Sequence, residues 1–154
     1  MASSRSSHSA LSCADNFATG SADVLQLVGR ILMSYLFLSA GWGKLTNVIG
    51  TTAYFKGLGV PSPSVMAYLV GSLEVAVGVA LILGLATRYA AIVVFIFVLV
   101  ATVIAHRYWT YPAEAQTAQF VQFTKNLAIM SGLLFVLVVG AGRFSVDAVL
   151  AKKQ

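Results

Sequence analysis

The stretch "SLEVAVGVALILG" (residues 72–84) decides the fold class. It lies within an apolar run over roughly 65–85 whose one charged residue is Glu74. About 20 apolar residues suffice for a helix to cross the hydrocarbon core of a bilayer. A carboxylate is costly in hydrocarbon, so Glu74 is expected to be paired, protonated or facing a cavity. The stretch therefore predicts a membrane helix and poses the question of what Glu74 does.

The composition of the whole chain agrees with a membrane protein. Its 154 residues are 58% hydrophobic and 10% charged, whereas a soluble domain carries roughly 25% charged residues. The net charge of +5 comes from scattered basic residues. Such charge influences the orientation of a membrane protein and its attraction to anionic lipid, and nucleic-acid binding is not expected. The single cysteine, Cys13, can form neither an internal disulfide nor a Cys-x-x-Cys redox pair.

Four stretches are long and apolar enough to span a membrane. They lie at roughly 24–44, 65–85, 87–105 and 124–142. Short connections favour antiparallel neighbours, so the predicted fold is an all-α, integral membrane four-helix transmembrane bundle with up-down topology.

The remaining segments are expected to be short or peripheral. Residues 1–22 are predicted to be a disordered polar tail, 23–148 the transmembrane domain, and 149–154 a short basic tail. Residues 51–59 are expected to form a short interfacial helix. Five Lys and Arg residues lie on the side of the termini, against three or four on the side of the longer loops. This bias predicts that both termini lie in the cytoplasm.

Several polar residues share helix faces. At 100° per residue, Arg30 and Lys44 lie on one face of the first span, together with Ser34 and Gly41. Glu74 shares a face of the second span with two glycines, so it is expected to point at a neighbouring helix. When the ends of antiparallel spans are aligned, Arg30 and Glu74 differ in depth by roughly 6 Å. We therefore predict an Arg30–Glu74 pair, either as a structural ion pair or as part of a site.

The predicted site is a polar pocket with Glu74 as its floor. Lys44, His106, Lys125 and Asn126 would ring its mouth on the non-cytoplasmic side, because all four lie near that end of their spans. Such convergence in an apolar bundle is typical of a small-molecule site. Each residue also has a structural interpretation: Lys44 and Lys125 could snorkel to the interface, His106 and Trp42 could be interfacial, and Asn126 could bridge helices.

The available residues exclude several kinds of chemistry. No cluster has zinc or iron ligand spacing, and the one histidine outside the tail excludes bis-histidine haem within one chain. No glycine-rich nucleotide loop is present, and no covalently bound cofactor is expected. Proton and anion chemistry remains. A bound quinone could receive protons from Glu74 and His106, and its headgroup could be bound by Arg30, Lys44, Trp42, Lys125 and Asn126. Alternatively, Arg30, Lys44 and Lys125 could hold an anionic substrate.

Five segments in order resemble the DoxX family: "GRILMSYLFLSAGWGKL" (29–45), "YFKGLGVPSP" (54–63), "YLVGSLEVAVGVALILGLATRYAA" (68–91), "NLAIMSGLL" (126–134) and "GAGRFSVD" (140–147). The similarity covers about residues 25–147. It implies a small bacterial inner-membrane protein with four transmembrane helices, related to the small-subunit type of a thiosulfate:quinone oxidoreductase. The family pattern falls on Arg30, Gly41, Lys44, Gly71, Glu74, Gly78, Asn126 and Arg143.

Three functions remain open from the sequence. The first is a quinone-linked oxidoreductase or oxidoreductase subunit, with electrons from a small sulfur compound or a redox protein partner. The second is a non-catalytic membrane anchor or assembly partner of a redox or respiratory complex. The third is a small anion or proton transporter. The lipid bilayer is a partner in all three, and the oligomeric state is left open.

Overall fold

The structure is a computed structural model that describes the backbone of residues 3–153 and the side chains of residues 12–153. Four helices are long and apolar enough to cross a membrane: α2 (Ala22–Thr46), α4 (Pro63–Leu83), α5 (Thr87–Ala105) and α6 (Ala113–Val139). Shorter elements flank them, namely α1 (Ser3–Gly20), α3 (Val48–Gly57), the 3₁₀ helix η1 (Tyr108–Thr110) and α7 (Val146–Ala151). Within residues 3–153 every regular element is helical, which confirms the predicted four-helix membrane bundle.

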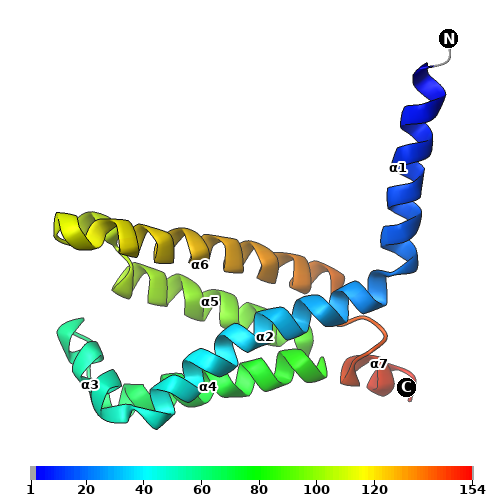
Figure 1. Ribbon diagram of the computed structural model, residues 1–154. Coiled ribbons are helices and arrows are strands. Elements are labelled where there is room, and N and C mark those ends of the chain that lie inside the picture. The colour runs from blue at the N-terminus through cyan, green and yellow to red at the C-terminus, as the bar shows by residue number, and fades with distance from the viewer. Residues whose placement is uncertain (1–2, 154) are drawn as a thin grey trace.

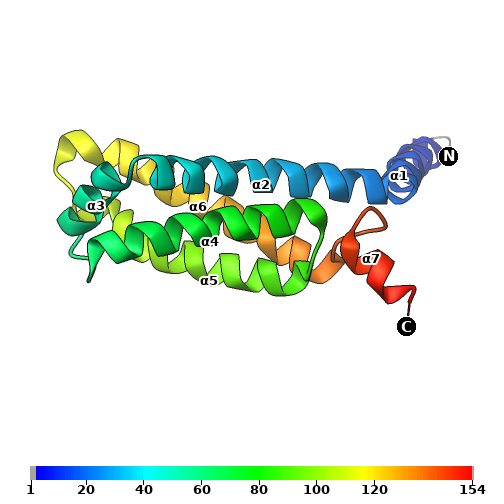
Figure 2. The same cartoon turned by 90° about the horizontal axis from the view of Figure 1, so that it is seen from below.

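The bundle consists of two helix pairs. Helix α2 packs mainly on α4, and α5 packs mainly on α6 (Figure 1). The two pairs lie close together near the chain termini and diverge toward the end that carries α3 and the α5–α6 connection. Both termini lie at the same end of the bundle (Figure 2). Their predicted location in the cytoplasm stays a prediction.

Two segments differ from the predicted boundaries. The tail expected to be disordered contains helix α1, which meets α2 at a sharp bend at Ser21 (Figure 1). Backbone hydrogen bonds continue across the bend, since Ser21 N–H donates to Phe17 O and Leu25 N–H donates to Ser21 O. An existing helix removes the cost of nucleating a new one. Helix α6 begins at Ala113 instead of 124, since its first turns are polar and a search for apolar runs does not find them. Lys125 and Asn126 were expected near the start of their span, but they lie well inside α6.

The apolar core receives side chains from all four spanning helices. It comprises Phe37, Val77, Ala91, Val94, Val98, Ile129, Met130 and Leu133. Glycines bring α2 and α4 together beside this core: a Cβ at Gly41 would lie 2.7 Å from Gly71 O, and a Cβ at Gly78 would lie 2.7 Å from Leu38 Cγ. These close approaches fix how far one helix is shifted along the other.

Candidate functional site

Glu74 forms a buried ion pair with Lys44. Lys44 Nζ lies 2.7 Å from Glu74 Oε2 and 2.9 Å from Oε1, so one ammonium group donates to both carboxylate oxygens. Glu74 is 5% exposed, and the Lys44 side chain is 24% exposed. The pair joins α4 to α2. It gives the Glu74 carboxylate a charged partner, which its own apolar span does not contain.

The predicted Arg30–Glu74 pair is wrong. Gly41 lies level with Glu74, since a Cβ at Gly41 would lie 2.9 Å from Glu74 Cβ. Arg30 is eleven residues from Gly41, which corresponds to roughly 16 Å along the helix. The axial offset follows from the glycine contacts between α2 and α4, whereas the prediction aligned the ends of the apolar spans.

Arg30 instead stabilises the opposite end of the bundle. Its guanidinium is fully buried and donates to the carbonyl oxygens of Leu81 (2.9 Å), Ile82 (3.0 Å) and Phe144 (2.5 Å). The first two are at the C-terminus of α4, where carbonyls lack helical partners and a cation is favoured. Arg30 is therefore a structural residue that connects α2, α4 and the segment before α7.

A second buried polar pair joins α5 to α6. Asn126 Nδ2 donates to Thr102 Oγ1 at 2.8 Å, and Thr102 Oγ1 donates to Val98 O at 2.6 Å. Both side chains are buried. An amide has two N–H donors and a carbonyl acceptor, so this contact uses only part of the hydrogen-bonding capacity of Asn126.

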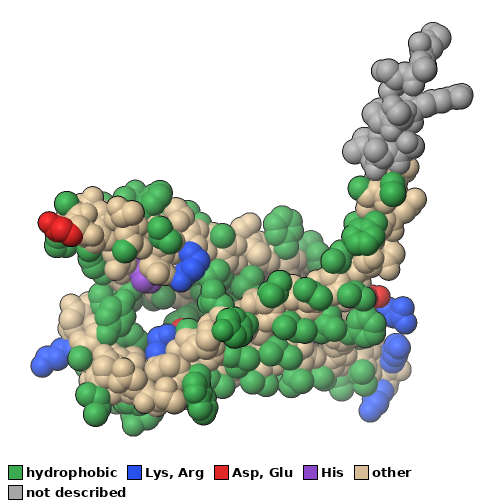
Figure 3. Space-filling model, viewed as in Figure 1, with side chains coloured by type: hydrophobic (Ala, Val, Ile, Leu, Met, Phe, Trp, Pro, Cys, Tyr) green, Lys and Arg blue, Asp and Glu red, His purple; other side chains and the backbone are tan. Residues whose placement is uncertain are grey.

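Lys44, Glu74, Thr102 and Asn126 form what we call the polar layer. Three of them lie one helical turn from core residues: Glu74 from Val77, Thr102 from Val98, and Asn126 from Ile129. Residues three or four apart share a helix face, so these polar groups point to the bundle axis directly beside the apolar core. Figure 3 shows the surface hollowed between the two helix pairs at the α3 end, with charged side chains at its border.

His106 lies beyond the polar layer, toward the α3 end. It is half-buried, four residues after Thr102, and its Nδ1 lies 2.8 Å from Gln119 Oε1 of α6. An aromatic cluster adjoins it, in which Tyr108 makes edge contacts with Trp109, Phe120 and Phe123.

Tyr54 of α3 also belongs to this end of the bundle. Burial raises the pKa of Tyr54 above its usual value, and the nearby Tyr111 adds to the rise. The α3 end therefore combines aromatic rings with one imidazole.

Two predicted site residues lie away from the polar layer. Lys125 is exposed and donates to the side chain of Gln122 on its own helix. Trp42 is 66% exposed and, with Tyr35 and Leu38, lines a shallow apolar groove of about 320 Å³ on the outer face of α2. One residue of helix turns a side chain by about 100°, which directs Trp42 away from the face of Gly41.

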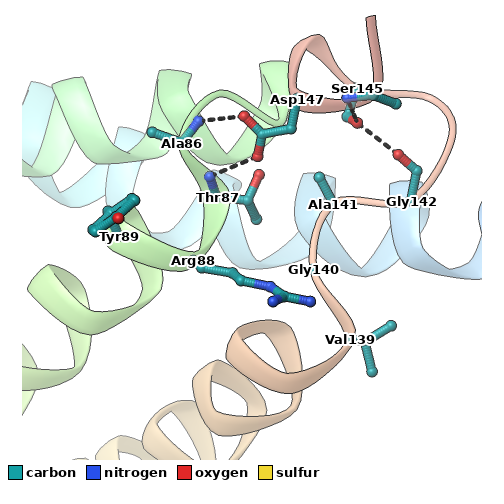
Figure 4. A pocket seen from close by; sticks show the side chains of 11 residues that line it. Ala86, Thr87, Arg88, Tyr89, Val139, Gly140, Ala141, Gly142, Ser145 and Asp147 are labelled. Carbon is teal, nitrogen blue, oxygen red and sulfur yellow. Dashed lines mark hydrogen bonds between the residues drawn. The ribbon is translucent and has the colours of Figure 1, made fainter. Parts of the chain in front are cut away.

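Sequence reasoning missed Asp147, which caps α5 from a distance. Its carboxylate accepts hydrogen bonds from Ala86 N–H (2.7 Å) and Thr87 N–H (2.9 Å) (Figure 4). Desolvation raises the pKa of Asp147, but the bonds from Thr87 and Ala86 and the charge of Arg30 lower it more, so the net shift is downward. The sequence feature that could have pointed to Asp147 is Ser145-x-Asp147, in which Ser145 caps α7 and Asp147 lies in the first turn of that helix. The role of Asp147 is structural.

The polar layer suits proton and hydrogen-bond chemistry. Within the described residues, no group of three or more His, Cys, Asp or Glu side chains could hold a metal ion. The layer offers a carboxylate, an ammonium group, an amide and a hydroxyl, all near an apolar core. These groups can orient a polar headgroup and exchange protons with it.

Comparison with known proteins gives consistent matches. The sequence profile of the DoxX family matches residues 25–107. The chain is 39% identical to the Escherichia coli protein "Inner membrane protein YqjF" over 131 residues, which are 85% of this chain and 95% of that protein. It is 32% identical to the Escherichia coli protein "Inner membrane protein YphA" over 124 residues, covering 80% and 89% of the two chains.

A shorter match concerns a protein with an activity in its name. The chain is 33% identical to the Bacillus subtilis protein "Putative oxidoreductase CatD" over 78 residues, which are 51% of this chain and 56% of that protein. No solved structure matches the chain significantly.

Proposed function

The chain belongs to the DoxX family, and we propose that it is a bacterial inner-membrane protein that binds a quinone headgroup in its polar layer and serves as a quinone-linked oxidoreductase or as a subunit of one. The polar layer carries this proposal. Its buried hydrogen-bonding groups come from both helix pairs and lie beside the apolar core. A membrane-soluble ring with a carbonyl on either side needs such an apolar slot with donors on opposite walls.

Each polar residue has a role in this proposal. Lys44 exchanges its long bond to Ala40 O (3.4 Å) for a bond to a quinone carbonyl, and its other two N–H groups keep the Glu74 carboxylate bound. The second N–H of Asn126, which Thr102 does not use, donates to the other carbonyl. Glu74 delivers a proton to the ring, and His106 passes protons inward from the open end of the bundle.

The proposed reaction balances with an external donor. A quinone takes up two electrons and two protons to become a quinol. A small sulfur compound or a redox protein partner supplies the electrons and is oxidised by two electrons. The protons come from water by way of His106 and Glu74. The described residues contribute binding, orientation and proton transfer, and the electrons pass directly between donor and ring.

The comparisons support parts of the proposal. Two relatives matched over most of their length are named as inner membrane proteins, which supports that location. The protein named as an oxidoreductase is matched over about half of each chain, and this partial similarity supports a redox role for the present chain. The range that the family profile matches, residues 25–107, covers the positions of Lys44, Glu74 and Thr102.

Quinone binding to the purified protein in nanodiscs tests the proposal. Wild type is compared with Glu74→Gln, which removes the carboxylate charge, and with Asn126→Leu, which removes the amide. Glu114→Gln is the matched control, because Glu114 is exposed at the start of α6. We expect saturable binding of a short-chain quinone to wild type and to the control. Asn126→Leu should weaken binding by up to roughly tenfold, since it removes a neutral hydrogen bond worth about 0.5–1.5 kcal/mol. Glu74→Gln should also weaken binding, because it removes the charge that holds the Lys44 ammonium in place.

Two results would overturn the proposal. One is the absence of saturable quinone binding in wild type, which would favour the role of a non-catalytic membrane anchor. The other is equal binding by wild type and folded Glu74→Gln and Asn126→Leu, which would place any quinone outside the polar layer. Proton or anion flux in proteoliposomes without quinone binding would favour a transporter.

A further inference from the structure

A cavity of about 400 Å³ lies at the end of the bundle that carries the termini, opposite the polar layer. Its walls are the start of α5, the end of α6 with the residues 140–142 that follow it, and the start of α7 (Figure 4). This volume is within the range of small-molecule sites. No residue of the proposed quinone site lines it, so an inference about this cavity is independent of the proposed function.

The Arg88 side chain extends into this cavity. Figure 4 shows its guanidinium lying across the space between α5 and the segment at Gly140. Its Nη2 donates to Val138 O at 3.2 Å. A guanidinium has five N–H donors, so this bond leaves donors for a ligand. Gly140 has a φ of 84° and no Cβ, and a Cβ there would lie 3.4 Å from Arg88 Nε.

The charges around the cavity favour an anion. Within residues 12–153 the ion pairs are Lys44–Glu74 and Arg143–Asp23. Arg88, which lines the cavity, therefore has no acidic partner there, and neither do Lys152 and Lys153, which follow α7 in the sequence. Asp147 also lines the cavity, but both of its carboxylate oxygens accept N–H bonds from the start of α5. Its charge is thus directed to the helix terminus and not to the open space.

The position of the cavity along the membrane normal indicates what kind of anion it binds. Arg88 is the second residue of a membrane-spanning helix, so it lies at the boundary between hydrocarbon and headgroups. Its neighbour Tyr89 is 75% exposed, as is typical of aromatic residues at the headgroup level. Val139 and Leu85 offer exposed apolar surface beside them. Phospholipid phosphates occupy this depth, and arginine binds phosphate through paired N–H groups.

We propose that this cavity binds the phosphate headgroup of an anionic phospholipid, with Arg88 as its principal ligand. Basic pockets between spanning helices are suited to such headgroups. The lysines that follow α7 attract the negative lipid, Arg88 binds its phosphate, and Tyr89 packs against its glycerol region. The lipid would thereby connect α5, the C-terminus of α6 and α7.

Ligand-dependent thermal stability tests this proposal. Purified protein in neutral detergent is titrated with short-chain phosphatidylglycerol, with short-chain phosphatidylcholine, or with inorganic phosphate. We expect phosphatidylglycerol to raise the melting temperature of wild type at concentrations where the other two do not. Arg88→Gln should weaken the apparent affinity for phosphatidylglycerol roughly tenfold or more, because charge-assisted hydrogen bonds are lost. Lys56→Gln is the control, since it removes the same charge at the opposite end.

Three results would overturn the proposal. The first is an equal response of Arg88→Gln and Lys56→Gln to phosphatidylglycerol. The second is an equal effect of inorganic phosphate and phosphatidylglycerol on wild type, which would make the ligand a free anion. The third does not depend on a variant that folds: native mass spectrometry of wild type, released from mixed phosphatidylglycerol and phosphatidylcholine, would show no preferential retention of phosphatidylglycerol.

Discussion

Gly41→Ala tests whether the contact between α2 and α4 sets the geometry of the polar layer. The new methyl group would lie 2.7 Å from Gly71 O, 2.9 Å from Glu74 Cβ and 2.9 Å from Val75 Cγ2. A backbone oxygen and a Cβ cannot rotate away, so the two helices must separate. Gly43→Ala is the matched control, because nothing lies within 4 Å of a Cβ at Gly43, two residues away on the same helix.

The two variants differ mainly by the steric clash. Replacing a glycine inside a helix with alanine stabilises the helix by roughly 0.5–1 kcal/mol, and this gain applies to both. Forcing an extra methyl group into a packed interface costs about 1–3 kcal/mol. We therefore expect the free energy of unfolding of Gly41→Ala to be about 1–3 kcal/mol below that of Gly43→Ala. The separation should also weaken the Lys44–Glu74 pair, which lies within one turn of the contact.

Reversible unfolding in mixed micelles, followed by circular dichroism, measures this difference. The reasoning requires Gly41→Ala to be the less stable variant and also the weaker in quinone binding. If the two variants have the same stability, the close approach at Gly41 does not exist as described. The axial offset that pairs Glu74 with Lys44 would then lose its physical basis.

Two further predictions concern the opposite end of the bundle. Arg30→Met removes the hydrogen bonds of Arg30 to three backbone carbonyls, of which Leu81 O keeps a bond from Gly84 N–H, and should lower the free energy of unfolding by about 2–4 kcal/mol. Arg143→Met, at an exposed pair, should change it by less than about 1 kcal/mol in the same assay. Equal losses would refute the structural role of Arg30. Because folding lowers the pKa of Asp147, its contribution to stability is complete above the ordinary carboxyl value of 3.8 and is lost as the pH falls below it. Melting temperatures measured across this acid range should fall more steeply for wild type than for Asp147→Asn, and parallel curves would contradict this assignment.

Helix faces could be predicted from the sequence because they depend only on local rotation. Arg30, Ser34, Gly41 and Lys44 were expected on one face of the first span. The first three are buried in α2, and Lys44 is partly buried against Glu74. Glu74 was expected to point at a neighbouring helix, and it is buried between two glycines of α4 that contact α2. The 100° rotation per residue fixes such faces whatever the rest of the chain does.

The partner of each polar residue could not be predicted in the same way. Glu74 pairs with Lys44 and not with Arg30, because the offset between α2 and α4 depends on where their glycines meet. Asn126 meets Thr102 because α6 begins at Ala113 and extends past the end of α5, which the polar first turns conceal in the sequence. A shift of a few residues along a helix moves a side chain by several ångströms, which is enough to exchange its partners.

The sequence by itself determined the membrane class, the four spans and the inward direction of Glu74, because apolar length and helical periodicity are local properties. Only the tertiary structure decided that Glu74 pairs with Lys44, that Arg30 binds the C-terminus of α4, and that Asp147 caps α5 from 60 residues away. Those contacts depend on the axial offsets and connections between helices. The offsets follow from side chains that meet only after the helices have packed.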